Sequence, residues 1–228
     1  PVLVTPGEAY FVINNARIVQ LRSGRLLAPT GYCQEVWTAG EHFRTVMFYS
    51  DDAGRTWHRA PGEVDAPKRG AMEPGVVELR DGRVLQIIRT QMGEIWKSYS
   101  SDEGLTWDEP RSLGVVAPEA PSTIARIPTT GDLVLFHNPE AQVGTDHCGP
   151  RTPLSVSISH DEGETWQRTI DIETDRTKYY AYLSCTFWEG RALLTYYVSN
   201  MPYEGGVGLS QKFVSLPVEA LYGAEKAE

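Results

Sequence analysis

The sequence predicts an all-β fold, a β-propeller built from four-stranded antiparallel blades, because two short motifs recur along it in step. The first is an octet, S-x-D-x-G-x-T-W, whose three copies start 50 and 59 residues apart, at 50–57, 100–107 and 159–166. The second is a glycine turn that leads into an apolar strand, at 23–27, 81–85, 130–135 and 189–194. Repetition about every 55 residues, without a sustained helical period, is typical of propeller blades.

Each octet has the chemistry of a tight β-hairpin turn. Its aspartate can accept backbone N–H groups across the turn, and its glycine supplies a conformation that a Cβ would obstruct. The serine and threonine add local hydrogen bonds, and the tryptophan fills an apolar site. We therefore interpret the three aspartates of these boxes as structural: Asp52, Asp102 and Asp161.

The two repeats together define one structural unit. It reads as a strand, a glycine turn, an apolar strand, a variable stretch and a hairpin closed by the box. Segments such as 76–79 and 156–158 have the β-branched, apolar character of strands. Four units, the last without a box, predict about four blades in a single domain over residues 1–228. The tail at 218–228 is expected to form a short helical turn or a frayed end.

Composition narrows the classes of partner. The net charge of −9 and the pI near 5.1 argue against nucleic acid or an anionic membrane, since both would be repelled. No apolar run approaches the length that spans a bilayer. The three cysteines show neither metal-ligand spacing nor a disulfide framework, so we expect no metal or cofactor: Cys33, Cys148 and Cys185. The sequence indicates no particular cell compartment.

With its repeats placed, the chain resembles the sialidase superfamily, in particular the bacterial branch of BNR-repeat (Asp-box) proteins. The resemblance runs from about residue 14 to residue 222. It implies a six-bladed propeller with its site at the central axis. Six blades at this repeat length need about 340 residues. We therefore expect this chain to be the C-terminal portion of such a propeller, with about two further blades upstream of Pro1.

The resemblance also implies a pair of catalytic residues. Glu73, in A-M-E-P-G, matches the glutamate that acts as a base on a tyrosine nucleophile. Tyr182, in Y-A-Y-L-S, matches the nucleophile in the family's Tyr-x-Tyr-Pro-Ser, with Tyr179 and Tyr180 as register alternatives. A tyrosine suits a substrate with a carboxylate on its anomeric carbon, because that carboxylate would repel an anionic nucleophile. The glutamate would compensate for a phenol pKa near 10.

Three arginines correspond, by the same resemblance, to those that bind the substrate carboxylate. Arg89 and Arg151 match the family's positions, and Arg17 matches its context only weakly. Planar guanidinium groups engage a carboxylate bidentately and stay charged. The family's acid/base aspartate has no counterpart between Arg17 and the first box. The residues there that have suitable chemistry are Glu35, Glu41 and His42.

Each of these residues could instead have a purely structural role. Arginines form interblade salt bridges, a glutamate before proline caps a turn, and tyrosines pack in cores. His137 and Asn138 follow an apolar strand, and we favour strand termination over sugar contact for both. The pair Asp146 and His147 is too small to define a metal site.

Three functional hypotheses follow. The first is a sialidase-like exo-glycoside hydrolase that binds and cleaves a terminal acidic sugar through the tyrosine, the glutamate and an arginine clamp. The alternative, favoured by the absent aspartate, is a non-catalytic Asp-box propeller that binds carbohydrate or protein. The third is a complete small propeller, or an open arc whose exposed edges pair with a second copy in a homo-oligomer.

Overall fold

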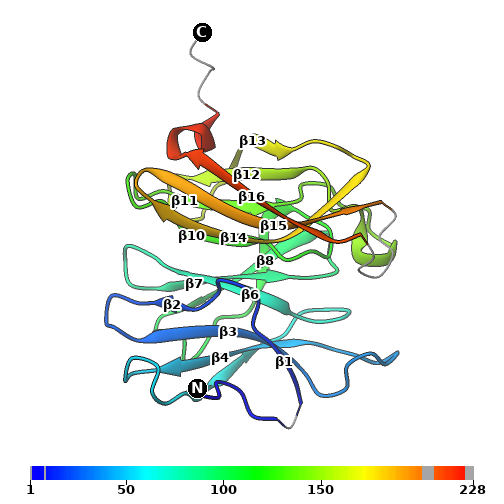
Figure 1. Cartoon of the computed structure of the whole chain (residues 1–228). Coiled ribbons are helices and arrows are strands. Elements are labelled where there is room, and N and C mark those ends of the chain that lie inside the picture. The colour runs from blue at the N-terminus through cyan, green and yellow to red at the C-terminus, as the bar shows by residue number, and fades with distance from the viewer. Residues whose placement is uncertain (1, 8, 202–207, 224–228) are drawn as a thin grey trace.

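The computed structural model describes residues 2–7, 9–201 and 208–223, and it confirms the all-β fold. Four antiparallel sheets follow one another along the chain (Figure 1). Their strands are β1 (Tyr10–Val12), β2 (Val19–Gln20), β3 (Leu26–Cys33), β4 (Arg44–Ser50) and β5 (His58–Val64); β6 (Met72–Glu78), β7 (Val84–Arg89), β8 (Glu94–Ser100) and β9 (Arg111–Val116); β10 (Thr123–Arg126), β11 (Leu133–His137), β12 (Leu154–Ser159) and β13 (Gln167–Glu173); β14 (Lys178–Trp188), β15 (Arg191–Asn200) and β16 (Ser210–Pro217).

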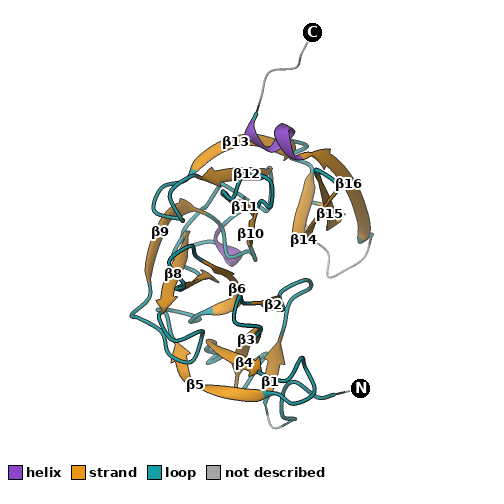
Figure 2. Cartoon of the chain, turned by 90° about the vertical axis from the view of Figure 1, so that its left-hand side faces the viewer, coloured by secondary structure: helices purple, strands orange, loops and turns teal. Residues whose placement is uncertain are grey.

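The sheets are arranged as propeller blades. In Figure 2 they lie around an arc with β2, β6, β10 and β14 innermost and β5, β9, β13 and β16 outermost. The arc is open between the first and last sheets, as one form of the third hypothesis expected. Near the axis its two ends touch, because the side-chain amide of Asn15 donates to the carbonyl of Tyr182 at 3.0 Å. Pairing of the edges with a second copy stays a prediction.

The predicted four-stranded blade is confirmed for the two middle sheets, whereas the outer two differ from it. In the first sheet, β1 and β2 both pair with β3, at its two ends, so that the innermost strand is interrupted over residues 13–18. The last sheet has three strands among the described residues. It is followed by a short 3-10 helix, η2 (Val218–Tyr222), where a helical turn was expected.

The boxes form the hairpin turns that their residues predict. In the first box, the N–H of Thr56 donates to Asp52 Oδ1 at 2.8 Å, and the N–H of Gly54 donates to Ser50 Oγ at 2.9 Å. The same bonds recur in the other two boxes. Gly54 has a φ of 82°, a conformation that favours glycine. The bonds from Thr56 lower the pKa of Asp52 to about 2.

Box turns also join neighbouring blades. A Cβ added to Gly104 of the second box would lie 3.1 Å from the side chain of Leu27 in the first sheet, and one added to Gly163 would lie 2.8 Å from Leu85 in the second. The box glycine is therefore required by its backbone conformation and by the close approach of the preceding blade.

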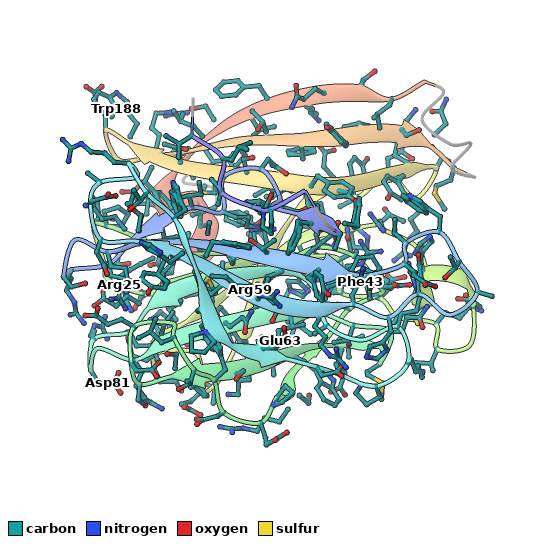
Figure 3. All side chains as sticks on the ribbon, turned by 90° about the horizontal axis from the view of Figure 1, so that it is seen from below. Arg25, Phe43, Arg59, Glu63, Asp81 and Trp188 are labelled. Atoms are coloured by element: carbon teal, nitrogen blue, oxygen red, sulfur yellow. The ribbon has the colours of Figure 1, made fainter. Side chains whose placement is uncertain are left out.

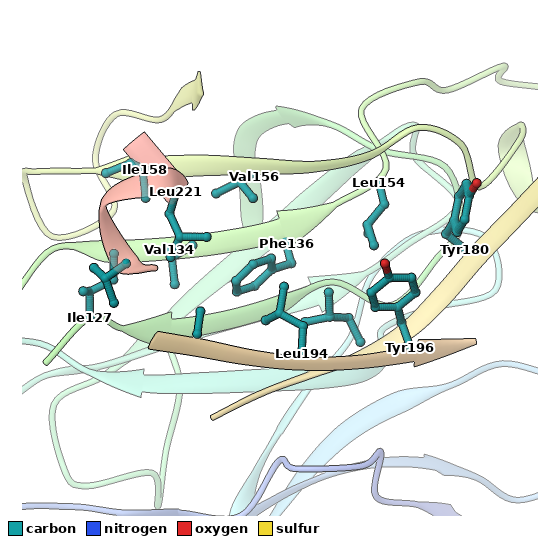
Figure 4. Close-up of a cluster of buried hydrophobic side chains, with 13 residues drawn as sticks. Ile127, Val134, Phe136, Leu154, Val156, Ile158, Tyr180, Leu194, Tyr196 and Leu221 are labelled. Carbon is teal, nitrogen blue, oxygen red and sulfur yellow. The ribbon is translucent and has the colours of Figure 1, made fainter. Parts of the chain in front are cut away.

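The largest apolar cluster lies between the third and fourth sheets (Figure 4). Phe136 of β11, Tyr196 of β15 and Leu221 of η2 all contribute to it, and each is fully buried. The helix thus closes one end of this inter-sheet core. In Figure 3, Phe43 lies at one end of the strands and Arg25 lies at the opposite end. Arg25 marks the end with the box turns, because its Nε donates to Asp51 of the first box at 2.7 Å.

Candidate active site

A cleft of about 500 Å³ opens at the strand ends opposite the box turns. Its wall combines residues from β1, β6, β7 and β14 with loops at 36–43 and 147–151. Four of the residues assigned to the site from sequence line it together: Glu73, Arg89, Arg151 and Tyr182. The structure therefore brings together side chains that lie up to 109 positions apart.

Tyr182 and Glu73 are in contact across the cleft. The hydroxyl of Tyr182 lies 3.4 Å from Glu73 Oε1. Both residues lie at irregularities in their strand pairing, between Met72 and Gly75 in β6 and between Ala181 and Ser184 in β14. Both have positive φ angles, 40° for Glu73 and 56° for Tyr182. Bulges re-aim side chains at sheet edges, which accounts for the second and fourth blades directing these two side chains at each other.

Arg89 is held on the other side of Glu73. Its guanidinium forms an ion pair with Glu73 through Nη1, and Nη2 lies 3.7 Å from Glu119 Oε1. Burial alone would lower the pKa of Arg89, but the negative charges of Glu73 and Glu119 and a hydrogen bond to Glu73 together raise it. Arg89 is therefore a cation throughout the physiological pH range.

Arg151 is buried and differs from Arg89 in its partners. Its Nη2 donates to the backbone carbonyl of Glu119 at 3.1 Å, and its guanidinium lies over the rings of Tyr179 at 4.9 Å and Tyr182 at 5.8 Å. Its Nε and Nη1 have no hydrogen-bond partner, and no ion pair joins it to a carboxylate of the described residues. A buried guanidinium with unused donors is suited to receive an anionic group.

Arg17, the third arginine assigned from sequence, is not among the cleft-lining residues. It is buried, and its guanidinium donates to the carbonyl of Ser122 at 2.7 Å and to Thr123 Oγ1 at 3.1 Å. Burial lowers the pKa of Arg17 to about 10. In the structure this arginine connects the interrupted inner strand of the first blade to the start of β10.

Of the two register alternatives for Tyr182, one lines the cleft and the other is buried in the core. Tyr180 is buried in the core between the third and fourth sheets, where burial raises its pKa to about 12. Tyr179 lines the cleft beneath Arg151. Alternation along β14 places Tyr180 on the face opposite Tyr179, and the irregularity between Ala181 and Ser184 brings Tyr182 to the same side as Tyr179.

Glu119 is a cleft-side residue that the sequence interpretation missed. Its carboxylate is fully buried and forms an ion pair with Arg69 besides its contact with Arg89. Its Oε2 accepts from Gln91 Nε2 at 3.1 Å and lies 3.2 Å from His147 Nδ1. Burial would raise the pKa of Glu119, but the bond to His147 and the charges of the two arginines lower it overall. The only sequence signal was an acidic residue between two prolines, in P-E-A-P.

Of the three residues considered as substitutes for the missing acid/base aspartate, only Glu41 lines the cleft. Glu41 lines the cleft, where it forms an ion pair with Arg69 and accepts the N–H of Trp37 at 2.8 Å. Glu35 and His42 are not among the lining residues, and His42 Nε2 lies 2.6 Å from Asp65 Oδ1.

Two histidines weighed from sequence have partners of their own. His137 Nε2 lies 2.9 Å from Ser157 Oγ in the third sheet, away from the cleft, which agrees with the strand-terminating role that we favoured. His147 lies beside Glu119. The described residues hold no group of three potential metal ligands, and no helix among them has the length and apolar character needed to cross a membrane.

Comparisons with solved structures agree with the propeller fold. Trypanosoma rangeli sialidase, in complex with the inhibitor DANA, superposes with a TM-score of 0.66 at 19% identity, over 89% of this chain and 32% of that chain. A leech intramolecular trans-sialidase gives a TM-score of 0.64 at 19% identity, over 95% and 33%. A Dyadobacter fermentans protein of unknown function gives 0.62 at 19% identity, over 89% and 52%.

Sequence comparison gives the same relationship. A sialidase from Micromonospora viridifaciens is 28% identical in an alignment of 162 residues that covers 65% of this chain and 23% of that protein. The chain therefore spans about a quarter of this curated relative. The family model of the BNR repeat-like domain matches residues 5–194. This chain is thus a member of the BNR repeat-like domain family, with the propeller fold of the sialidases.

Proposed function

We propose that the cleft binds a terminal acidic sugar and cleaves it from a glycan, as a sialidase-like exo-glycosidase. The observation that carries the proposal is the contact of the Tyr182 hydroxyl with Glu73, 3.4 Å apart, beneath the buried guanidinium of Arg151. In this proposal Arg151 and Arg89 bind the sugar carboxylate. The M. viridifaciens relative is named a sialidase, and the T. rangeli structure holds a sialidase inhibitor.

The chemistry needs a nucleophile and a base, and these two residues have the required contact. Glu73 takes the phenolic proton while Tyr182 Oη attacks the anomeric carbon, and the glycosidic bond breaks as the aglycone leaves with the bonding electron pair. Water then attacks the glycosyl-tyrosine and releases a proton to solvent, the Tyr182 oxygen leaves with the bonding pair, and Glu73 returns the phenolic proton to it. The aglycone oxyanion takes up a proton from solvent. Two displacements at one carbon retain its configuration. The ion pair with Arg89 holds the Glu73 carboxylate in place beside the phenol of Tyr182.

The test is hydrolysis of an aryl sialoside, 4-methylumbelliferyl N-acetylneuraminic acid, whose good leaving group needs no proton from the protein. We expect turnover by the chain, retention of the anomeric configuration by NMR, and loss of turnover in Tyr182→Phe. Tyr197→Phe is the matched control, since its ring packs 5.6 Å from that of Tyr182. Turnover by Tyr182→Phe at the rate of the unaltered chain would refute the nucleophile assignment.

A binding function without cleavage is the second candidate. It is favoured by the position of Glu41, the carboxylate that lines the cleft from the first blade, because both of its oxygens are already engaged, by Arg69 and by the N–H of Trp37. Absence of turnover, together with saturable binding of N-acetylneuraminic acid by calorimetry that is weakened in Arg151→Ala, would establish this candidate in place of the first.

A further inference from the structure

Glu119 reaches both arginines of the proposed carboxylate clamp, Arg89 and Arg151. It lies in the segment between β9 and β10, where Pro118 and Pro121 restrict the backbone. Its side-chain Oε1 lies 3.7 Å from Arg89 Nη2, and its backbone carbonyl accepts from Arg151 Nη2 at 3.1 Å. One residue thus connects two guanidinium groups that approach the cleft from different blades.

The position of Glu119 is itself fixed from several sides. Its backbone N–H donates to the carbonyl of His147 at 2.7 Å, and its Oε2 lies within hydrogen-bond distance of His147 Nδ1 and Gln91 Nε2. Arg69 forms an ion pair with Oε1. A fully buried carboxylate is retained in a fold only when such partners compensate for its desolvation. The partners also keep it anionic, since they lower its pKa despite its burial.

Arg89 needs a second partner to keep its direction. Its Nη1 is bound to Glu73, and its Nε has no hydrogen-bond partner. Without the charge of Glu119, the guanidinium would be held at one nitrogen only and could rotate about that contact. A planar group binds a carboxylate through two parallel bonds only when its plane is fixed, so this rotation would weaken bidentate binding.

We propose that Glu119 is a positioning residue that sets the orientation of Arg89 and Arg151 and thereby gives the cleft its selectivity for carboxylated sugars. This inference rests on the proposed function and extends it, because it assigns the selectivity to a residue that does not line the cleft. Glu119 acts through the two arginines and touches no reacting atom. Its loss should therefore affect binding of the carboxylate far more than the chemical step.

The first experiment needs no ligand and no activity. The Nε–Hε signals of Arg89 and Arg151 are identified in the NMR spectrum of the whole chain by their loss in Arg89→Lys and Arg151→Lys. In Glu119→Gln we expect the Arg89 signal to shift and broaden, because the isosteric amide lacks the charge, and the Arg151 signal to change less, because its contact is with the retained backbone carbonyl. Glu140→Gln is the control, since Glu140 forms an ion pair with Arg176 that is remote from the cleft. Unchanged signals in folded Glu119→Gln would overturn the proposal.

The second experiment measures selectivity by calorimetry with N-acetylneuraminic acid and its methyl ester. We expect Glu119→Gln to reduce the preference for the acid at least tenfold while affinity for the ester stays within about twofold. If both affinities fell equally, Glu119 would be merely structural and the proposal wrong. If the unaltered chain bound neither compound, the proposed function would fail, and the NMR experiment would still decide the role of Glu119.

A second variant covers the case in which Glu119→Gln does not fold. His147→Ala removes one partner of Glu119 Oε2 at a half-exposed position and leaves the buried charge in place. We expect the Arg89 signal to shift in the same direction by a smaller amount. Absence of any shift in folded His147→Ala, when Glu119→Gln cannot be obtained, would count against the proposal.

Discussion

Tyr182 and Glu73 meet at 3.4 Å because each lies in a bulge of an inner strand, in β14 and β6 respectively, and each has a positive φ. A regular strand would direct alternate side chains to opposite faces of its sheet. The bulges instead turn both residues toward the cleft. Positive φ at two non-glycine residues is uncommon and concentrates at functional sites. This pair is therefore the part of the site with the strongest geometric support.

Glu73→Gln should abolish most turnover without abolishing binding. The amide cannot accept the phenolic proton, and we expect kcat on the aryl sialoside to fall about 10²–10⁴-fold. Affinity for N-acetylneuraminic acid should change far less, and calorimetry on the same preparation measures it. Glu94→Gln, in the neighbouring strand β8, serves as the control. Full activity in Glu73→Gln would show that another group is the base.

Removal of Arg151 should weaken binding of the acid, whereas removal of Arg17 should lower the stability of the fold. Arg151→Ala should weaken binding of the acid by about 1.5–3 kcal/mol, since it removes a charged donor from the cleft. Arg17→Ala should leave the acid-to-ester preference intact and lower the free energy of unfolding by about 1–3 kcal/mol, because the carbonyl of Ser122 loses its buried donor. Urea denaturation and calorimetry separate the two effects. A loss of acid preference in Arg17→Ala would place that arginine in the binding site after all.

Asp102→Ala should destabilise the second blade. The carboxylate accepts from the hydroxyl of Ser100 at 2.7 Å and from the N–H of Thr106 at 2.8 Å. We expect the free energy of unfolding to fall by about 1–3 kcal/mol, because these donors lose their acceptor. Asp108→Ala, at an exposed aspartate of the same hairpin, is the control. Equal losses in the two variants would deny the box aspartate its structural role.

His137 should make the fold sensitive to mild acid. Burial, with the charge of Arg168, lowers the pKa of His137 to about 4, against about 6.5 for histidine in an unfolded chain. Between these two pH values the unfolded state binds more protons than the folded state. The contribution of His137 to the free energy of unfolding is therefore fully present above pH 6.5, and it falls by roughly 3 kcal/mol as the pH drops to 4.

His137→Gln tests this dependence. The amide keeps a polar group near Ser157 but does not titrate, so the variant should lose the slope between pH 6.5 and 4 in urea denaturation. His58→Gln, at an exposed histidine, should retain it. Curves for His137→Gln that run parallel to those of the unaltered chain would assign the slope to other groups.

The sequence by itself determined the propeller, its repeat and its box turns. These depend on local chemistry: an aspartate, a glycine and a tryptophan at fixed spacing specify the same hairpin each time it occurs. The family resemblance that these repeats support selected Glu73, Arg89, Arg151 and Tyr182, which the fold then brings to one cleft.

Only the tertiary structure decided which charged residues contact one another and which of them reach the cleft. Arg17 is buried against the third blade, and Glu119, a single acidic residue between prolines, contacts both arginines of the proposed clamp. Such contacts join residues from different blades, and their partners depend on where each bulge and loop turns a side chain. No local pattern encodes those directions, because they follow from the packing of one blade against the next.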